Sequence, residues 1–364
     1  MSSPDLLYSD VEEDLRSSVR ALLTDRAGPA AVLARVETAE PYDRQLWRTL
    51  AADLGAAGLL VPEERGGHGA SAREVAVVLE ELGRSVAPVP FLGSAVLATS
   101  ALLATGEDVL LPRLAAGELT GALAVPLSTA PGSPFPSTVR ADGTLTGEVR
   151  TVADASVADV LVVPAVSADG PGLYAVEASD ATVVEAVSLD LTRRIADVTL
   201  SAAPARPVAL GAAAESALDG ALTAAAGLLA SEQTGLTEWA LTETVTYLKG
   251  RYQFGRPVGG FQSLKHRLAN LYTDLVSARA TARYAADALA AGHDVPIAVA
   301  VAQSRAAPIA VHATEEAIQL HGGIGMTWEH PAHLYLKRAK SNELALGTPG
   351  RHRARLAELV ELPA

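Results

Sequence analysis

The order of hydrophobic periodicities along the chain restricts its fold more than any other feature. From Asp5 to about residue 118, apolar residues recur every three to four positions, as in VEEDLRSSVRALLTDR, which predicts amphipathic helices. Short runs rich in Val, Thr and Ala follow to about residue 208 and are separated by Gly, Asp and Pro, which predicts strands. Helical periodicity then returns in segments long enough for four antiparallel helices.

These patterns predict a mainly α-helical protein with a β domain in its middle. We expect an N-terminal helical domain at 1–118, a middle β-barrel domain at 119–208 and a C-terminal four-helix bundle at 209–364. Abundant alanine and only 4% aromatic residues predict that the helices pack closely through small side chains. An α–β–α order of this kind is uncommon and narrows the choice of families.

Charge and cysteine content exclude several classes of function. A formal net charge of −13 at pH 7 disfavours contact with a phosphate backbone, so we expect no nucleic-acid partner. The absence of cysteine excludes disulfides, thiolate metal sites and cysteine nucleophiles. No run is apolar enough for a membrane helix, and the start MSSPDLLYSDVEEDLR is acidic where a signal peptide is basic and then apolar. We therefore expect a cytoplasmic protein without a membrane contact.

Two glycine-rich stretches in the C-terminal part are candidates for ligand binding. RYQFGRPVGGFQSLKH (251–266) joins two predicted helices, and EEAIQLHGGIGMTWEHP (315–331) contains the end of a third. Adjacent glycines let backbone N–H groups approach an oxygen-rich ligand such as a diphosphate, whose charge Arg251 can neutralise. Either stretch alone is also what an ordinary turn between helices requires.

Taken together, the two stretches resemble the acyl-CoA dehydrogenase family. The shared pattern is RxxFGxPxGxFQxxKHxxA followed by QxxGGxG, behind a β insert and an N-terminal domain that contains EELGRSVAPVP. The resemblance covers essentially the whole chain and implies an FAD-dependent enzyme that desaturates an acyl-CoA thioester between its α and β carbons. It implies contacts to the diphosphate and adenosine portion of FAD from Arg251, Gln253, Phe254, Phe261 and Gln262 and, across a dimer interface, from Gln319, Gly322 and Gly323.

The same resemblance indicates that the catalytic base is missing. Removal of the α proton needs a carboxylate, and the family's usual Glu stands just before a Gly-Thr pair, where this chain has Leu346. The alternative family position for the base falls on Ala225, and Ala226 stands where an Arg near the substrate is common. Glu343 and Glu232 lie about one and two helical turns from these positions and are the candidates for a relocated base. A solvated or helix-capping role for both is the simpler interpretation.

The middle domain lacks the groups that the family places against the flavin ring. Where members carry Thr-Glu-Pro, this chain has VPLSTAPGS (125–133). Where they carry Trp-Ile-Thr or Trp-Ile-Ser, it has GEVRTVADA (147–155), without Trp. By this resemblance the chain retains the adenosine half of the FAD site and lacks the surface for the isoalloxazine ring.

The function that we favour is a non-catalytic subunit that completes the FAD site of a paralogous acyl-CoA dehydrogenase subunit. The assembly is expected to be a hetero-oligomer such as a heterotetramer, acting on an acyl-CoA thioester of a steroid side chain or another bulky acid. An electron-transfer flavoprotein is a compatible electron acceptor. The alternatives are an independent homo-oligomeric flavoenzyme with a relocated base, and a redox-silent scaffold protein without FAD.

The remaining polar candidates carry weaker signals. His321 lies in the second glycine-rich stretch and is interpreted as a residue packed beside the turn. None of the eight histidines shows metal-ligand spacing, so no metal site is predicted. KRAK (337–340) and GRHRAR (350–355) form a small basic patch, which is interpreted as a solvated helix face, with contact to CoA phosphates as the alternative.

Overall fold

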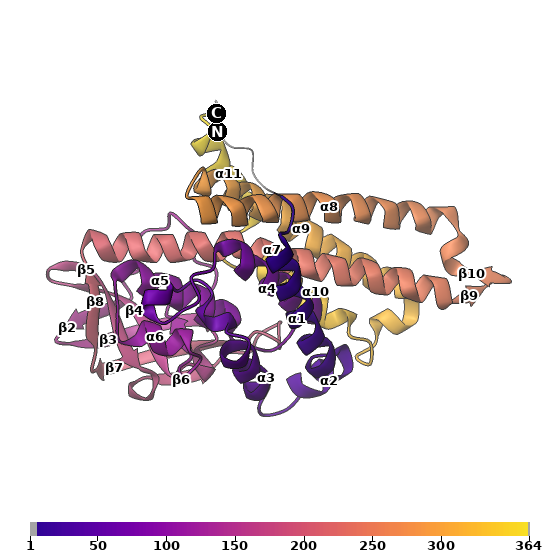
Figure 1. Cartoon of the computed structure of the whole chain (residues 1–364). Coiled ribbons are helices and arrows are strands. Elements are labelled where there is room, and N and C mark those ends of the chain that lie inside the picture. Colours follow the sequence, from indigo (N-terminus) through magenta and orange to yellow (C-terminus); the bar gives the residue numbers. More distant parts are fainter. Residues whose placement is uncertain (1–5, 363–364) are drawn as a thin grey trace.

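The computed structural model describes residues 6–362, so the first five residues of the acidic start lie outside the described part (Figure 1). The first part of the chain is helical, and two of its helices begin at capping boxes, Ser9 with Glu12 and Ser71 with Glu74. In each box the Ser and Glu side chains satisfy backbone N–H groups that the first helical turn leaves free. The helices of this part are α1 (Asp10–Arg26), α2 (Pro29–Val36), α3 (Arg44–Arg48), α4 (Ala72–Ser85), α5 (Thr99–Thr105) and α6 (Leu110–Ala115).

An eight-stranded sheet forms the middle of the molecule. Its order is β6-β7-β3-β2-β4-β5-β8, with β1 beside β4, and β1 and β2 run parallel to β4 while the other neighbours are antiparallel. The sequence predicts a barrel; within residues 6–362 the pairing leaves β6 and β8 as two free ends, so the sheet is open at that seam. The strands are β1 (Gly121–Leu123), β2 (Val139–Asp142), β3 (Thr144–Ala153), β4 (Val160–Ser167), β5 (Gly170–Glu177), β6 (Thr182–Glu185), β7 (Ile195–Ala203) and β8 (Arg206–Leu210).

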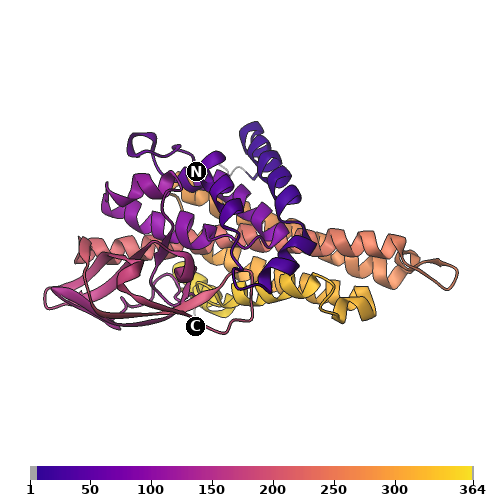
Figure 2. The same ribbon diagram turned by 90° about the horizontal axis from the view of Figure 1, so that it is seen from below.

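The C-terminal part is a bundle built on three long helices. Figures 1 and 2 show the sheet against the first half of α7, with the small hairpin of β9 (Tyr252–Gln253) and β10 (Arg256–Pro257) at the opposite end of the molecule. The predicted fourth helix is shorter and is followed by a fifth, because the chain turns at Gly347, whose φ is +100°. The helices are α7 (Ala212–Gly250), α8 (Gln262–Ala291), α9 (Val295–His321), α10 (Ala332–Leu344) and α11 (Pro349–Leu359).

Apolar burial ties these parts together. The main core runs from the N-terminal helices to α7, α9 and α10, and the sheet has a second core of its own. Within residues 6–362, no helix is both long enough and apolar enough to cross a bilayer. The boundaries predicted at residues 118/119 and 208/209 stay a prediction; the strands of the sheet begin at Gly121 and end at Leu210.

Two glycines bring α4 and α7 into backbone contact. A Cβ atom on Gly235 of α7 would lie 1.9 Å from the Glu80 carbonyl oxygen of α4. Conversely, a Cβ atom on Gly83 of α4 would lie 2.1 Å from the Glu232 carbonyl oxygen of α7. Real Cβ atoms do not approach so closely, so any side chain at either position pushes the two helices apart. The Gly within the EELGRSVAPVP segment therefore has a packing role.

This contact predicts opposite effects for two Gly→Ala changes in the same helix. We expect Gly235→Ala to lower the free energy of unfolding by roughly 1–3 kcal/mol or more, because the methyl group meets backbone atoms. Gly220→Ala is the matched control: a Cβ there has no atom within 4 Å, so the gain in helix propensity should stabilise by up to about 1 kcal/mol. Urea unfolding followed by circular dichroism measures both, and equal effects of the two changes would contradict the proposed packing role.

Candidate functional site

The two glycine-rich stretches meet at the end of the molecule that carries the β9–β10 hairpin. There the last turn of α7, the hairpin, the start of α8 and the end of α9 enclose a cavity of about 500 Å³. One chain supplies all of these segments, and the contacts to FAD expected across a dimer interface stay a prediction. The predicted residues that line it are Arg251, Gln253, Gln319, Gly322 and Gly323.

Arg251 is the cation that this cavity offers to an anionic ligand. Its backbone ends α7, where its N–H donates to the Tyr247 carbonyl at 2.9 Å. Its side chain is exposed and makes no ion pair or hydrogen bond with another described residue. The second arginine of the lining, Arg267, donates to the Glu316 carboxylate at 2.6 and 2.5 Å. One guanidinium is thus neutralised within the chain, and the other is available for a diphosphate.

The glycines of the loop after α9 differ in what a side chain would meet. Gly322 has a φ of +62°, where other L-residues are strained, and a Cβ on Gly322 or Gly323 would have no atom within 4 Å. A Cβ on Gly325 would instead lie 2.5 Å from the Ile318 carbonyl oxygen. Packing within the chain therefore explains Gly325, whereas the bare backbone at Gly323 leaves room for a ligand beside the N–H groups.

The other three predicted residues do not line this cavity. Phe254 is 90% exposed at the hairpin and packs edge-on against Phe261, with 6.2 Å between the ring centroids. The Arg256 guanidinium lies 3.8 Å from the centroid of the Phe261 ring. Gln262 begins α8 and has an exposed side chain. Contacts from these residues require a ligand that extends beyond the cavity, and they stay a prediction.

Buried aliphatic side chains occupy both candidate positions of the missing base. Leu346, Ala225 and Ala226 are all 0% exposed, and the Leu346 N–H donates to the Leu127 carbonyl at 2.8 Å. Leu346 also has a φ of +54°, a left-handed conformation that costs a residue with a side chain about 1–2 kcal/mol. None of these side chains can accept a proton, so this region of the chain does not supply the base.

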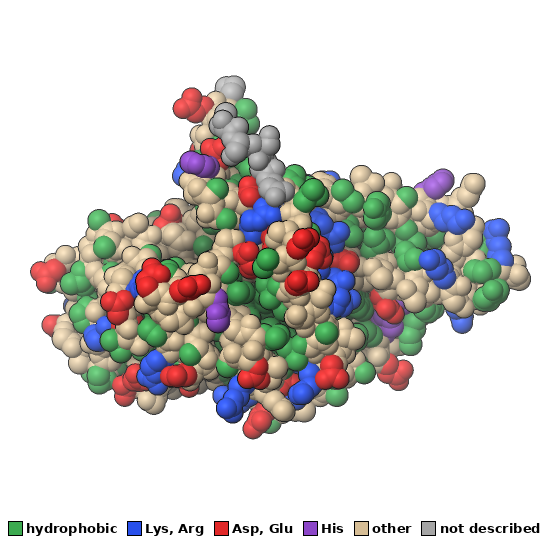
Figure 3. All heavy atoms as spheres, in the orientation of Figure 1, with side chains coloured by type: hydrophobic (Ala, Val, Ile, Leu, Met, Phe, Trp, Pro, Cys, Tyr) green, Lys and Arg blue, Asp and Glu red, His purple; other side chains and the backbone are tan. Residues whose placement is uncertain are grey.

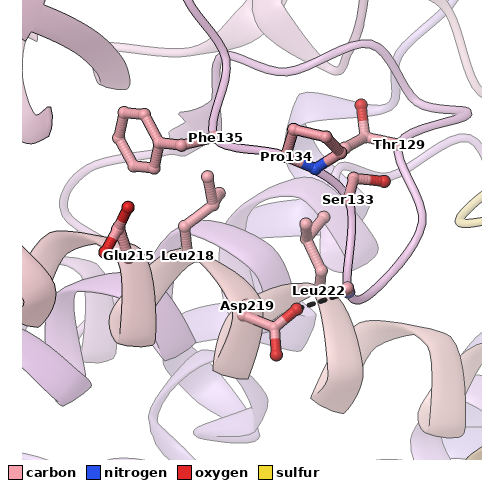
Figure 4. A pocket seen from close by; sticks show the side chains of 9 residues that line it. Thr129, Ser133, Pro134, Phe135, Glu215, Leu218, Asp219 and Leu222 are labelled. Atoms are coloured by element: carbon pink, nitrogen blue, oxygen red, sulfur yellow. Dashed lines mark hydrogen bonds between the residues drawn. The ribbon is translucent and has the colours of Figure 1, made fainter.

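The loop that carries VPLSTAPGS is fastened to the first half of α7 (Figure 4). The Gly132 N–H donates to the Asp219 carboxylate at 2.6 Å. Loop and helix enclose a cavity of about 270 Å³, toward which Phe135, Leu218 and Leu222 contribute apolar surface. This volume lies below the roughly 300–1,000 Å³ of typical small-molecule pockets, so the cavity does not replace a thioester pocket.

A larger cavity lies between the middle part and the end of α10. Its volume is about 520 Å³, and its lining includes Leu127, Thr151 and Glu343. Leu127 and Thr151 belong to the two segments that lack the family's flavin-facing groups. Glu343 is half-buried, with the Lys340 Nζ atom 3.7 Å from its carboxylate. Of the two candidates for a relocated base, Glu343 is therefore the one that borders open space.

Glu232 lies in a buried ion-pair network, so its interpretation as a solvated or helix-capping carboxylate is wrong. Its side chain accepts hydrogen bonds from Arg193, from Arg338 at 2.9 Å and from Asn342 at 3.0 Å. Arg338 also donates to Asp190 at 2.5 Å. Glu232 itself is 0% exposed. The network joins the loop before β7, the middle of α7 and α10.

The electrostatics of this network argue against Glu232 as a base. Burial alone would raise its pKa, but the positive charges of Arg193 and Arg338 outweigh that effect and lower the pKa to about 2. A general base works best with a pKa near the operating pH and needs a free lone pair. Sequence reasoning missed Arg193 and Asp190, since Arg193 and Glu232 are 39 positions apart and no motif connects them.

The basic residues of KRAK, in the patch predicted near the C-terminus, do not share one solvated face in the structure. Arg338 is 2% exposed and belongs to the buried network, so the solvated-face interpretation is wrong for this residue. Lys337 lies over the Trp328 ring, with Nζ 4.2 Å from the centroid. Lys340 pairs with Glu315 at 3.3 Å. The segment KRAK is therefore mainly used for contacts within the chain.

A helical N-terminal part, a middle sheet and a C-terminal bundle with a cofactor-sized cavity together define a class of oxidoreductase. Residues 9–118 match the family model for the acyl-CoA dehydrogenase N-terminal domain, and residues 215–360 match the model for its C-terminal domain. The chain belongs to the acyl-CoA dehydrogenase family. The family and the fold class predicted from the sequence are confirmed.

Relatives within this family resemble the chain over nearly its full length. Acyl-CoA dehydrogenase IpdE2 of Mycolicibacterium smegmatis is 38% identical over 348 residues, which cover 96% of this chain and 98% of the relative. A variant of the Tcur3481-Tcur3483 steroid ACAD superposes with a TM-score of 0.85 at 31% identity, covering 97% of this chain and 98% of that one. A chain of the ChsE4-ChsE5 complex from Mycobacterium tuberculosis gives 0.86 at 29% identity, covering 99% and 100%.

The buried network predicts how stability responds to acid. A carboxylate whose pKa falls on folding stabilises the native state above its unfolded value, here 4.5, and this contribution is lost as the pH drops toward 2. We expect Glu232→Gln to cost roughly 3–5 kcal/mol at pH 7, because it leaves buried guanidinium charge uncompensated. The variant should also lose less stability than the wild type between pH 5 and the lowest pH at which both fold.

Urea unfolding at a series of pH values measures this slope. Glu343→Gln is the control, since it removes a half-buried acid outside the network and should keep the wild-type slope. A Glu232→Gln variant as acid-sensitive as the wild type would show that the network does not hold this carboxylate ionised.

Proposed function

We propose that this chain is the non-catalytic subunit of an FAD-dependent acyl-CoA dehydrogenase assembly. It supplies the half-site for the diphosphate and adenosine portion of FAD, and a paralogous partner subunit supplies the surface for the flavin ring and the catalytic glutamate. The proposal rests on the contrast between the environments of Arg251 and Leu346. Arg251 is unpaired among the described residues and lies beside bare glycine backbone, whereas Leu346 is buried where the base would stand.

The residues present fit one part of FAD and not the other. Arg251 can bind diphosphate oxygens through two N–H groups, and the backbone at Gly322 and Gly323 can donate to the same oxygens. Gln253 and Gln319 offer amide donors and acceptors to the adenosine portion. When bound, FAD supplies the acceptor for the hydride that leaves the β carbon of the thioester. The task of this chain is to bind and orient the nucleotide portion.

The relatives support the choice of partner and substrate class. One is described as a steroid ACAD, and another is a complex of two chains, ChsE4 and ChsE5. By analogy, we propose that this chain pairs with a paralogous subunit in a cytoplasmic hetero-oligomer. Its substrate is a CoA thioester of a steroid side chain or another bulky acid, and an electron-transfer flavoprotein accepts the electrons.

The half-site can be tested by removing its free cation. We expect Arg251→Gln, co-expressed with the paralogous partner, to weaken FAD binding by the assembly about 10- to 100-fold, as the loss of a charge-assisted contact predicts. Arg44→Gln is the control, because Arg44 is an exposed arginine on α3 outside the cavity lining. Flavin fluorescence titration measures both variants. Unchanged FAD affinity after Arg251→Gln would favour a scaffold without FAD, and full turnover by the chain alone would refute the division of labour.

A second candidate function rests on the cavity beside Glu343. A half-buried carboxylate next to about 520 Å³ of partly apolar space is the arrangement that a relocated base would need. In that case this chain would be an independent flavoenzyme, and Glu343→Gln would slow α-proton exchange about 10²- to 10⁴-fold. Under the favoured proposal, the same change leaves the rate of the assembly within about twofold.

The matched control for this test is Glu315→Gln. Glu315 pairs with the same Lys340 but does not line the cavity. Exchange of the α proton of a thioester into deuterated water, followed by NMR, distinguishes the two functions. A large loss confined to Glu343→Gln would establish the relocated base.

A further inference from the structure

We propose that Glu243, His321 and His330 form a binding site for a divalent transition-metal ion such as Zn²⁺. The three residues come from α7, from the end of α9 and from the segment before α10. One ligand atom of each lies within 4.8 Å of the other two. His321 lines the cavity of the proposed flavin half-site, but none of the three side chains is assigned to the nucleotide, so the ion-binding test does not depend on that proposal.

His321 already has the environment of a metal ligand. It is 2% exposed, and its Nδ1 lies 2.6 Å from the Ala317 carbonyl oxygen, a contact that places the ring proton on Nδ1. The Nε2 atom then carries a lone pair, and it is buried without a hydrogen-bond partner among the described residues. Metal-binding histidines characteristically donate their second N–H to a carbonyl or carboxylate in this way.

The neighbouring rings hold His321 in place. Tyr247 stacks on it with 4.5 Å between the ring centroids, and the His330 ring lies 4.4 Å away at an interplanar angle of 47°. His330 is half-buried, and its Nδ1 receives only a long 3.3 Å contact from the Ala332 N–H. Moving the ring proton to that nitrogen therefore gives up a weak contact and leaves Nε2 available for a metal.

Glu243 contributes the negative charge. It lies one turn before Tyr247 on α7, is half-buried, and forms no ion pair with another described residue. A partly buried carboxylate beside two imidazole rings favours a cation that accepts both oxygen and nitrogen ligands. Calcium and magnesium prefer oxygen ligands alone, so zinc and its neighbours in the first transition row fit this set better.

The geometry requires a modest contraction. Zinc–ligand distances of about 2.0–2.1 Å in a tetrahedron place ligand atoms about 3.3 Å apart, so separations of at most 4.8 Å must close by at most about 1.5 Å. Glu243 and His330 are half-buried and can make this movement, whereas His321 is held by its neighbours. His321 also lines the 500 Å³ cavity, from which water can occupy a fourth position. A bound ion would tie α7, α9 and the glycine loop together.

The test uses the full-length chain, freed of any affinity tag, stripped with a chelator and titrated with Zn²⁺ by calorimetry. We expect saturable binding of one ion per chain, which Glu243→Gln and His330→Asn each weaken at least tenfold. His312→Asn is the control, because His312 is an exposed histidine on α9 outside the cluster. Its affinity should equal that of the wild type.

Two further measurements separate a loss of metal binding from a loss of folding and report the coordination of the ion. Circular dichroism establishes that both cluster variants fold, and the visible spectrum of the Co²⁺-loaded chain reports whether the ion has a tetrahedral nitrogen–oxygen environment. Zn²⁺ should raise the melting temperature of the wild type and of His312→Asn, and not that of the folded cluster variants. Absence of saturable binding to the wild type, or equal affinity in all variants, would overturn the proposal and leave a contact between the two histidine rings without a metal.

Discussion

The buried charges of Glu232, Arg193, Arg338 and Asp190 hold the parts of this molecule in register. Two guanidinium groups face two carboxylates, so the network is neutral although every member is at most 4% exposed. An unpaired charge in such a place would destabilise the fold by several kcal/mol. The four charged side chains must therefore be buried together in the folded state. Because they come from the loop before β7, the middle of α7 and α10, the network sets how the sheet meets the bundle.

The length of α7 separates the position of the missing base from the proposed nucleotide cavity. Ala225, at one candidate position for the base, and Arg251, at the nucleotide cavity, are 26 positions apart (251 minus 225) on one continuous helix and its cap. At 1.5 Å per residue this corresponds to about 39 Å, more than one dinucleotide can bridge. A cofactor bound in the proposed nucleotide cavity would therefore have its ring away from Ala225 of the same chain, as the proposed assembly of two or more chains requires.

Particular residues show what a local sequence pattern can and cannot predict. The motif pair pointed to Arg251, Gln319, Gly322 and Gly323, and the structure brings them to one cavity, because each motif lies at a helix end where glycine frees the backbone. Glu232 was predicted to be a solvated or helix-capping carboxylate, with a relocated base as the alternative. Its partners are 39, 106 and 110 positions away, and such a pairing leaves no periodic or local pattern to detect.

The sequence by itself determined the order of helices and strands, since periodicity is local, and it determined that Leu346 and Ala225 cannot act as bases, since proton affinity belongs to the side chain. Only the tertiary structure decided which charged side chains form ion pairs within the chain. Glu316 neutralises Arg267, no described residue neutralises Arg251, and His321 is left with a buried nitrogen that has no hydrogen-bond partner among the described residues. These outcomes depend on which distant segments pack against each other, because burial and charge pairing are properties of the packed molecule.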